Sequence, residues 1–98
     1  MAILESRVEK MLVDACKAAG IPTIKSENVD KGFPDRMLFV PNHGVIFVEI
    51  KNKTNYVRQA RQKRWAKRII AAKGKYYCID GEQEMRQFID KLIFWKGA

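Results

Sequence analysis

The chain has 98 residues, and its 19 lysines and arginines outnumber 11 acidic residues, which gives a formal net charge of +8 at pH 7. This length predicts about one small domain, over residues 1–98. The charge favours a polyanionic partner, nucleic acid before an anionic membrane. No stretch approaches the ~20 apolar residues of a spanning helix and no signal-peptide pattern opens the chain, so we expect a cytoplasmic protein that does not bind membranes.

The first third of the chain predicts one helix, a short strand and a loop. Apolar residues at helical spacing, ended by Gly20 and Pro22, predict a helix over residues 3–19. Residues 22–25 have modest strand character. Residues 26–33 contain Asn, Asp and Gly, which predicts a loop leading to the next strand.

A hairpin is predicted next. Residues 36–40 and 45–50 are apolar and partly β-branched, as expected for strands. The Pro-Asn-His-Gly sequence of residues 41–44 between them is typical of a turn. The two strands are therefore expected to pair antiparallel.

The remaining chain predicts two helices around one strand. A helix is expected over residues 56–72, where Lys73-Gly74 ends it, followed by a strand over residues 75–79. After a turn at Asp80-Gly81, apolar residues at helical spacing predict a last helix over residues 84–94. The order of elements indicates an α/β fold with a mixed sheet and helices on both faces.

The hairpin brings three ionisable groups to one end of the sheet. Side chains alternate along a strand, so Glu49 and Lys51 point the same way. Antiparallel pairing places Asp35, at the start of the first strand, beside them. Two close carboxylates repel each other unless a cation joins them, and hard oxygen ligands favour Mg²⁺ or Mn²⁺. The arrangement predicts a metal-dependent nuclease in which the lysine orients or helps to deprotonate a water.

A polar side chain interrupts the apolar stripe of the helix over residues 56–72. At ~100° per residue, Gln62 falls on the same side as Trp65 and Ile69, and Gln59 falls at the edge. We expect Gln62 to position water or phosphate beside Glu49; the alternative is an amide that bonds to a loop carbonyl. The outer side is basic and predicts phosphate contacts or, equally well, a solvated face; its cations are Arg58, Arg61, Lys63, Arg64, Lys67 and Arg68.

An acidic residue occupies the apolar side of the first helix in the same way. Glu5 lies close to Leu12 on the helical wheel, and Glu9 lies nearer the edge. Such an acid needs a basic partner, solvent or a metal cluster. The acidic residues of the following loop, Glu27 and Asp30, are interpreted as solvated.

The sequence lacks the histidine and cysteine residues that other catalytic systems and zinc sites require. His43 is the single histidine and lies in the predicted turn, so Ser/His/Asp and Cys/His systems and nucleases with several His ligands are set aside. Cys16 and Cys78 are too few for a cysteine-based zinc site, and we expect both to be free and buried thiols.

In combination, these residues resemble a known family. The Gly-Phe-Pro-Asp of residues 32–35, the Glu-Ile-Lys of residues 49–51 and Gln62, with Glu5 near the start, resemble the virus-type replication-repair nuclease (VRR-NUC) domain of the PD-(D/E)xK superfamily. The likeness covers residue 5 to about residue 79. Each motif alone is weak evidence for the family, whereas the motifs in this order and structural context are fairly specific to it.

The resemblance implies a restriction-endonuclease-like αβββαβ core, here with an extra C-terminal helix, and hydrolysis of DNA that depends on Mg²⁺ or Mn²⁺. Asp35 and Glu49 would bind the metal, and Lys51 would handle the attacking water. Glu5 and Gln62 would complete the site, with Glu5 a further metal ligand. The backbone carbonyl of Ile50 is another ligand that such folds imply.

The resemblance also implies a substrate and an assembly. Short chains with the nuclease core alone are similar to stand-alone phage and bacterial members, which resemble homodimeric Holliday junction resolvases. This predicts a DNA endonuclease selective for four-way junctions in a bacterial or phage-infected cell. Apolar residues of the last helix that exceed the needs of a small core are predicted to form part of the dimer interface: Phe88, Ile89, Leu92, Ile93, Phe94 and Trp95.

Two alternatives stay open. A nuclease of the same fold could act on flaps or other DNA. A non-catalytic nucleic-acid-binding module would use the basic helix with Trp65 or Tyr56, and its carboxylates would be salt-bridged to neighbouring cations.

Overall fold

A computed structural model describes residues 2–26, 29–51 and 56–97, with the backbone alone for residues 2–5 and 56–59. Within these residues the chain forms three helices and four strands, in the predicted order. They are α1 (Ala2–Ala19), β1 (Thr23–Lys25), β2 (Arg36–Val40), β3 (Gly44–Ile50), α2 (Tyr56–Ala71), β4 (Lys75–Ile79) and α3 (Gly81–Gly97).

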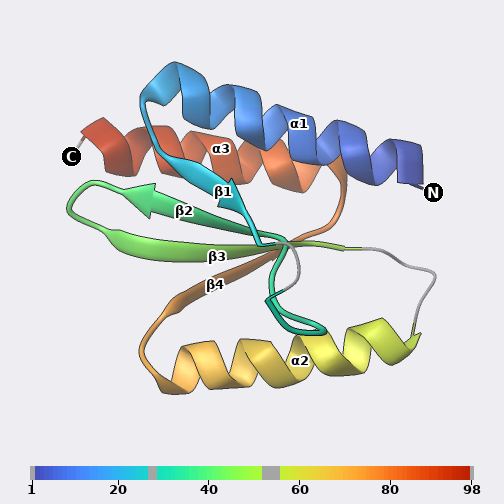
Figure 1. The fold of residues 1–98 in the computed structure, drawn as a ribbon. Helices are drawn as coiled ribbons and strands as arrows, with labels where there is room; N and C mark the ends of the chain where they lie inside the picture. Colours follow the sequence, from blue (N-terminus) through green and yellow to red (C-terminus); the bar gives the residue numbers. More distant parts are fainter. Residues whose placement is uncertain (1, 27–28, 52–55, 98) are drawn as a thin grey trace.

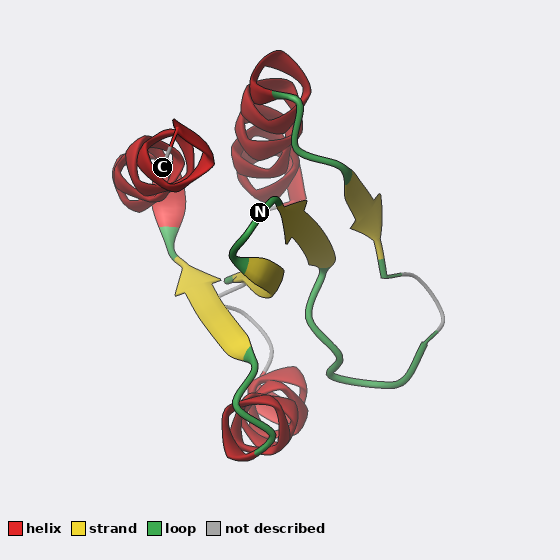
Figure 2. Ribbon diagram, turned by 90° about the vertical axis from the view of Figure 1, so that its left-hand side faces the viewer, coloured by secondary structure: helices red, strands yellow, loops and turns green. Residues whose placement is uncertain are grey.

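The strands form one mixed sheet in the order β1-β2-β3-β4. The first three pair antiparallel, and β4 pairs parallel to β3 after the crossover through α2. Helices α1 and α3 cover one face of the sheet, and α2 covers the other (Figure 1). Figure 2 shows the same layers end-on. The predicted α/β fold with helices on both faces is confirmed.

The hairpin of β2 and β3 has the register that the sequence predicts. Asn42 and Gly44 adopt positive φ angles of 68° and 77°, which the reversal of the chain requires and which Asn and Gly tolerate. Arg36 lies opposite Val48. One residue further along this register, Asp35 reaches the level of Glu49.

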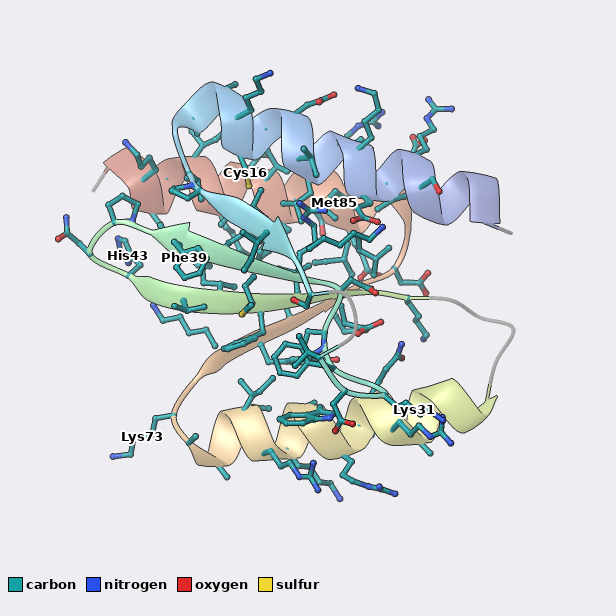
Figure 3. All side chains as sticks on the ribbon, in the orientation of Figure 1. Cys16, Lys31, Phe39, His43, Lys73 and Met85 are labelled. Carbon is teal, nitrogen blue, oxygen red and sulfur yellow. The ribbon has the colours of Figure 1, made fainter. Side chains whose placement is uncertain are left out.

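Alternation along the strands separates an apolar face from a polar one. Leu38 of β2 and Ile46 and Val48 of β3, which are all even-numbered, are fully buried in one cluster with Leu12 of α1 and Met85 of α3. Figure 3 shows Cys16 and Met85 between these helices and the sheet. The odd-numbered residues of β3 therefore face α2, and Glu49 is one of them.

Helix α3 begins three residues before its predicted start. The Glu84 carboxylate accepts a hydrogen bond of 3.0 Å from the backbone amide of Asp80, which satisfies a donor at the helix entrance. Apolar periodicity could not detect this first turn because its side chains are polar. In the described part of the chain, none of the helices has the length and apolar character needed to cross a bilayer.

The predicted exposure of the apolar residues of α3 is corrected. Phe88 and Leu92 are buried in the core, and Ile89 and Trp95 pack against it, so most of the expected interface residues stabilise the monomer instead. The exceptions are Ile93 and Phe94, which are 54% and 66% exposed.

The cysteines differ from each other, contrary to expectation. Both thiols are free, but only Cys16 is buried, whereas Cys78, on the edge strand β4, is exposed. Burial raises the pKa of the Cys16 thiol, and the nearby positive charge of Arg36 partly opposes this rise.

Candidate active site

Asp35 and the end of β3 meet at one end of the sheet. The Oδ2 atom of Asp35 accepts a hydrogen bond of 2.7 Å from the backbone amide of Ile50. This amide lies between Glu49 and Lys51 in the chain, so one contact fixes the first carboxylate beside the other two groups. The pairing of the hairpin brings these predicted site residues together, as expected.

Glu49 is fully buried, and its partner comes from α2. The amide Nε2 of Gln62 donates a hydrogen bond of 2.5 Å to Oε2 of Glu49, and Gln62 is itself only 7% exposed. The prediction that Gln62 faces inward is confirmed, and its partner is a carboxylate and not a loop carbonyl. A buried carboxylate is costly, and a hydrogen bond to a charged group returns about 1.5–3 kcal/mol. The side chain of Gln59 lies outside the described residues.

Lys51 lies at the solvent-facing rim of the same end. Its Nζ atom is 3.9 Å from Oδ2 of Asp80, and both side chains are partly exposed. Its backbone amide donates to the carbonyl of Ile79 at 2.9 Å, which holds the end of β3 against β4. Asp80 is a site neighbour that the sequence did not suggest, because its place depends on the register of β4 against β3.

Two further side chains, both from β4, have pKa values that the charges of the site shift. Cys78 lies opposite Glu49 in the parallel register, and Tyr76 lies opposite Phe47. Burial, followed by the negative charges of Cys78, Glu49 and Asp35, raises the pKa of Tyr76 well above its ordinary value. Although the Cys78 residue is exposed, its thiol is partly shielded from solvent; this shielding and then Glu49 raise the pKa of Cys78, and Lys51 opposes the rise. Both shifts keep these two groups uncharged near neutral pH, so Tyr76 and Cys78 add no negative charge to the site.

The loop before Asp35 is fixed against α2. Gly32 has a φ of +82°, and a Cβ atom there would overlap with Arg61 of α2. The Phe33 ring packs edge-on against Trp65 at 4.9 Å and against Phe47 at 5.8 Å. Glycine is thus required for both conformation and space in the turn that aims Asp35.

One acidic residue of this loop has a defined partner. Asp30 is exposed, as expected for a solvated loop acid, and it also accepts a hydrogen bond of 3.1 Å from the indole nitrogen of Trp65. Glu27 lies outside the described residues. The loop is therefore attached to α2 by a hydrogen bond, an aromatic contact and a close glycine contact.

Of the acidic residues Glu5 and Glu9 of α1, the structure shows the contacts of Glu9. Glu9 forms an ion pair of 2.7 Å with Arg36 of β2, and both side chains are largely buried. Arg36 also donates to the Thr23 hydroxyl at 3.2 Å, so Glu9 serves to join α1 to the sheet. The side chain of Glu5 lies outside the described residues. Figure 1 places the N-terminal end of α1 at the same end of the molecule as the end of β3.

The cations predicted to contact DNA lie on α2. Lys63, Arg64, Lys67 and Arg68 are exposed, and Arg61 is half-buried beside Gly32. The side chain of Arg58 is outside the described part. Helix α2 contains six cations and no carboxylate.

The oxygen donors fit a hard divalent cation. Mg²⁺ is commonly held by one or two carboxylates together with water and substrate phosphates, and Asp35 and Glu49 supply that number. Among the described side chains, no group of three or more His, Cys, Asp or Glu residues could hold a metal ion. Glu5, the further ligand that the resemblance implies, has a side chain outside the described residues.

Comparisons of the chain with known protein families, with curated proteins and with solved structures found no match. Support for the site comes from its own geometry. The carboxylates of Asp35 and Glu49 and the amide of Gln62 come from three separate segments and meet at one end of the sheet.

Proposed function

We propose that this protein is a divalent-metal-dependent DNA endonuclease with a restriction-endonuclease-like core of the VRR-NUC type. The observation that carries the proposal is the fully buried Glu49, which Gln62 holds from α2 beside the Asp35 carboxylate. A purely structural protein gains little from burying an acid at this position. The αβββαβ order of the first six elements agrees with such a core.

Each side chain of the site has a role in this proposal. Asp35 and Glu49 would hold Mg²⁺ or Mn²⁺, with the Ile50 carbonyl and Glu5 as further ligands. When bound, the cation would polarise the scissile phosphate and lower the pKa of a bound water. Gln62 keeps the Glu49 carboxylate in one orientation, since its amide donates to one carboxylate oxygen.

Lys51 is suited to charge that develops on the substrate. Its ammonium group lies at the rim and is paired with Asp80 at the long distance of 3.9 Å. A pair this loose and partly exposed contributes little to stability, so the ammonium can turn toward a phosphate oxygen or a hydroxide without a large penalty. Lys51 would steady the attacking hydroxide and the charge that forms on the phosphate.

The substrate in this proposal is branched DNA, and the active form is a homodimer that resolves four-way junctions in a bacterial or phage-infected cytoplasm. The net charge of +8 favours a DNA partner. Two active sites in one dimer would allow paired incisions. Ile93 and Phe94 are the exposed apolar residues of α3 that could contribute to the interface.

A panel of DNA structures tests the proposal. The protein would be incubated with Mn²⁺ and with duplex, splayed, flap and four-way junction DNA of related sequence. Paired, symmetric incisions in the junction would support a dimeric resolvase. Cutting confined to flaps would exclude the resolvase and leave the flap nuclease, and no cutting of any substrate would exclude the nuclease.

A second candidate is a non-catalytic nucleic-acid-binding module. The specific observation in its favour is that α2 carries six cations and no carboxylate, which suffices for DNA binding without chemistry. Such a module would be indifferent to divalent metal. Salt-sensitive DNA binding alone would not separate the two candidates, because both bind through phosphate contacts.

A further inference from the structure

The cations of α2 divide into two groups around the helix. Arg61, Arg64 and Arg68 follow each other at spacings of three and four residues and form one stripe, the arginine flank. Lys63 and Lys67 form a second stripe, the lysine flank, centred roughly 110° away at 100° per residue. Both flanks are on the same helix and each has two exposed cations, but their surroundings differ.

The arginine flank lies on the side of α2 that meets the loop. The guanidinium of Arg68 lies over the Trp65 ring at 4.9 Å from its centroid, and Trp65 donates to Asp30 of the loop. Arg61 packs against Gly32 of the same loop. Lys31 is exposed between these two loop contacts, and Figure 3 shows it beside α2. A fourth cation thus adjoins the arginine flank.

The Asp30 carboxylate adjoins these arginines through Trp65, but none of them forms an ion pair within 4.0 Å in the part of the chain that the structure describes. Within residues 2–26, 29–51 and 56–97, no carboxylate forms an ion pair with a side chain of the arginine flank. Like charges three and four residues apart destabilise a helix. An anionic ligand would remove this repulsion.

We propose that the arginine flank, together with Lys31, binds the phosphate backbone of one DNA strand, and that the lysine flank does not. The inference rests on the proposed function, since it takes DNA as the substrate. Arg61 adjoins Gln62, which contacts Glu49, so the flank begins beside the candidate active site. From Arg61 to Arg68 the helix rises about 10 Å, which matches about three nucleotides of one strand.

Side-chain chemistry favours the arginine flank over the lysine flank. A planar guanidinium binds phosphate through two parallel hydrogen bonds, whereas an ammonium acts as a point charge. Stacking on Trp65 already orders Arg68, so less side-chain entropy is lost when a phosphate binds. The strand would leave the active site along the loop-facing side of α2.

Two double variants with equal charge change test this placement. Arg64→Ala/Arg68→Ala and Lys63→Ala/Lys67→Ala each remove two exposed cations from the same helix. Affinity for a fluorescent four-way junction would be measured by anisotropy in EDTA, so that binding is scored without cleavage. We expect the arginine variant to lose at least about tenfold more affinity and to flatten the salt dependence by about two charges, with little change in the lysine variant.

Three outcomes would overturn the proposal: equal losses from the two variants, a larger loss from the lysine variant, or an arginine variant that binds as the wild type. Stronger arginine-dependent binding to anionic lipid vesicles than to DNA would overturn it as well. Circular dichroism would verify that both variants keep their helices, as alanine at exposed helical positions should allow.

Arg64→Lys/Arg68→Lys provides a finer control. It keeps the charge, so the salt dependence should match that of the wild type, while affinity should fall several-fold through the loss of paired hydrogen bonds. Unchanged affinity would show that charge alone matters and would contradict the role given to guanidinium geometry. DNA that is bound through the arginine flank but never cut would support the role of the flank and contradict the nuclease. DNA that is cut while the two flanks contribute equally would support the nuclease and contradict the role of the arginine flank.

Discussion

The two faces of the sheet differ in charge and in what they bury. Helices α1 and α3 each contain three carboxylates and three cations, whereas α2 contains six cations and no carboxylate. On the α1 and α3 side the core consists of apolar residues such as Leu12, Leu38 and Met85. On the α2 side the sheet buries Glu49 against Gln62. The α1 and α3 face also contains the largely buried ion pair of Glu9 and Arg36, whereas on the α2 face a buried carboxylate accepts a hydrogen bond from an uncharged amide.

Ion pairs show the same division. Arg7 pairs with Glu82 at 2.8 Å across α1 and α3, and Lys10 pairs with Asp14 at 2.9 Å along α1. Helix α2 has no such pair among the described residues. The excess positive charge of α2 gives this face a positive potential, which favours the binding of anionic groups.

The largest expected effect comes from removing a candidate metal ligand. Asp35→Ala and Glu49→Ala should each lower Mn²⁺-dependent cleavage of junction DNA by at least about 100-fold, since the oxygen ligands are lost. Far-ultraviolet circular dichroism should show an unchanged fold. Cleavage by purified Asp35→Ala at the wild-type rate would show that the site is assigned to the wrong residues.

Carboxylate repulsion predicts a second signature, for which Glu49→Gln is the suitable variant because it keeps the side-chain volume and an acceptor for Gln62. Without metal, this substitution should raise the melting temperature, because it removes one of the two negative charges of the site. Thermal denaturation in EDTA would measure this. A large drop instead would indicate that the carboxylates serve structural ion pairs, as the binding-module hypothesis requires.

Truncation in the apolar core should affect stability and leave chemistry intact. Leu38→Ala should cost about 2–5 kcal/mol of unfolding free energy, measured by urea denaturation, with cleavage per folded molecule unchanged. Ile70→Ala on α2 is the matched control, because Ile70 is 60% exposed. It should cost less than about 0.5 kcal/mol. A similar cost at both sites would contradict the assignment of the core to the α1 and α3 face.

The loop contact predicts an intermediate effect at Gly32. Gly32→Ala should cost about 1–3 kcal/mol, since it combines a strained φ with overlap against Arg61, and it should weaken cleavage by moving Asp35. Gly20→Ala has a similar φ of +71° but nothing within 4 Å of the added Cβ. It should cost about 1 kcal/mol and spare activity. Equal activity losses would show that the loop contact does not position Asp35.

The smallest effect is expected for a surface ion pair on the neutral face. Asp14→Ala breaks the exposed pair with Lys10 and should change the unfolding free energy by less than about 0.5 kcal/mol, with DNA affinity nearly unchanged. Urea denaturation and junction-binding anisotropy would measure both. A marked change in DNA affinity would mean that α1 contributes to the DNA surface and would weaken the contrast between the faces.

Local patterns predicted much of the fold and part of the site. The bounds of β2 and β4 follow from apolar runs between turn residues, and the helical wheel placed Gln62 inward. Pairing of a hairpin is local, so Asp35 could be set beside Glu49 from the sequence.

Features that depend on contacts between segments far apart in the sequence could not be predicted. Asp80 and Cys78 reach the site through the parallel pairing of β4 with β3, which no local pattern specifies. The attachment of the loop to α2 through Asp30 and Trp65 joins residues 35 positions apart. The entrance of α3 also escaped prediction, because its first turn is stabilised by a polar side chain and not by apolar periodicity.

Metal binding tests the central claim most directly. Calorimetric titration of the wild type with Mn²⁺ should give a dissociation constant on the order of millimolar or tighter, and Glu49→Gln should abolish the binding. This substitution keeps a hydrogen-bond acceptor for Gln62, so a loss of binding would reflect the missing charge and not a collapsed site. Mn²⁺ binding that is equal in the two proteins, or undetectable in both, would contradict a metal-dependent nuclease centred on Glu49.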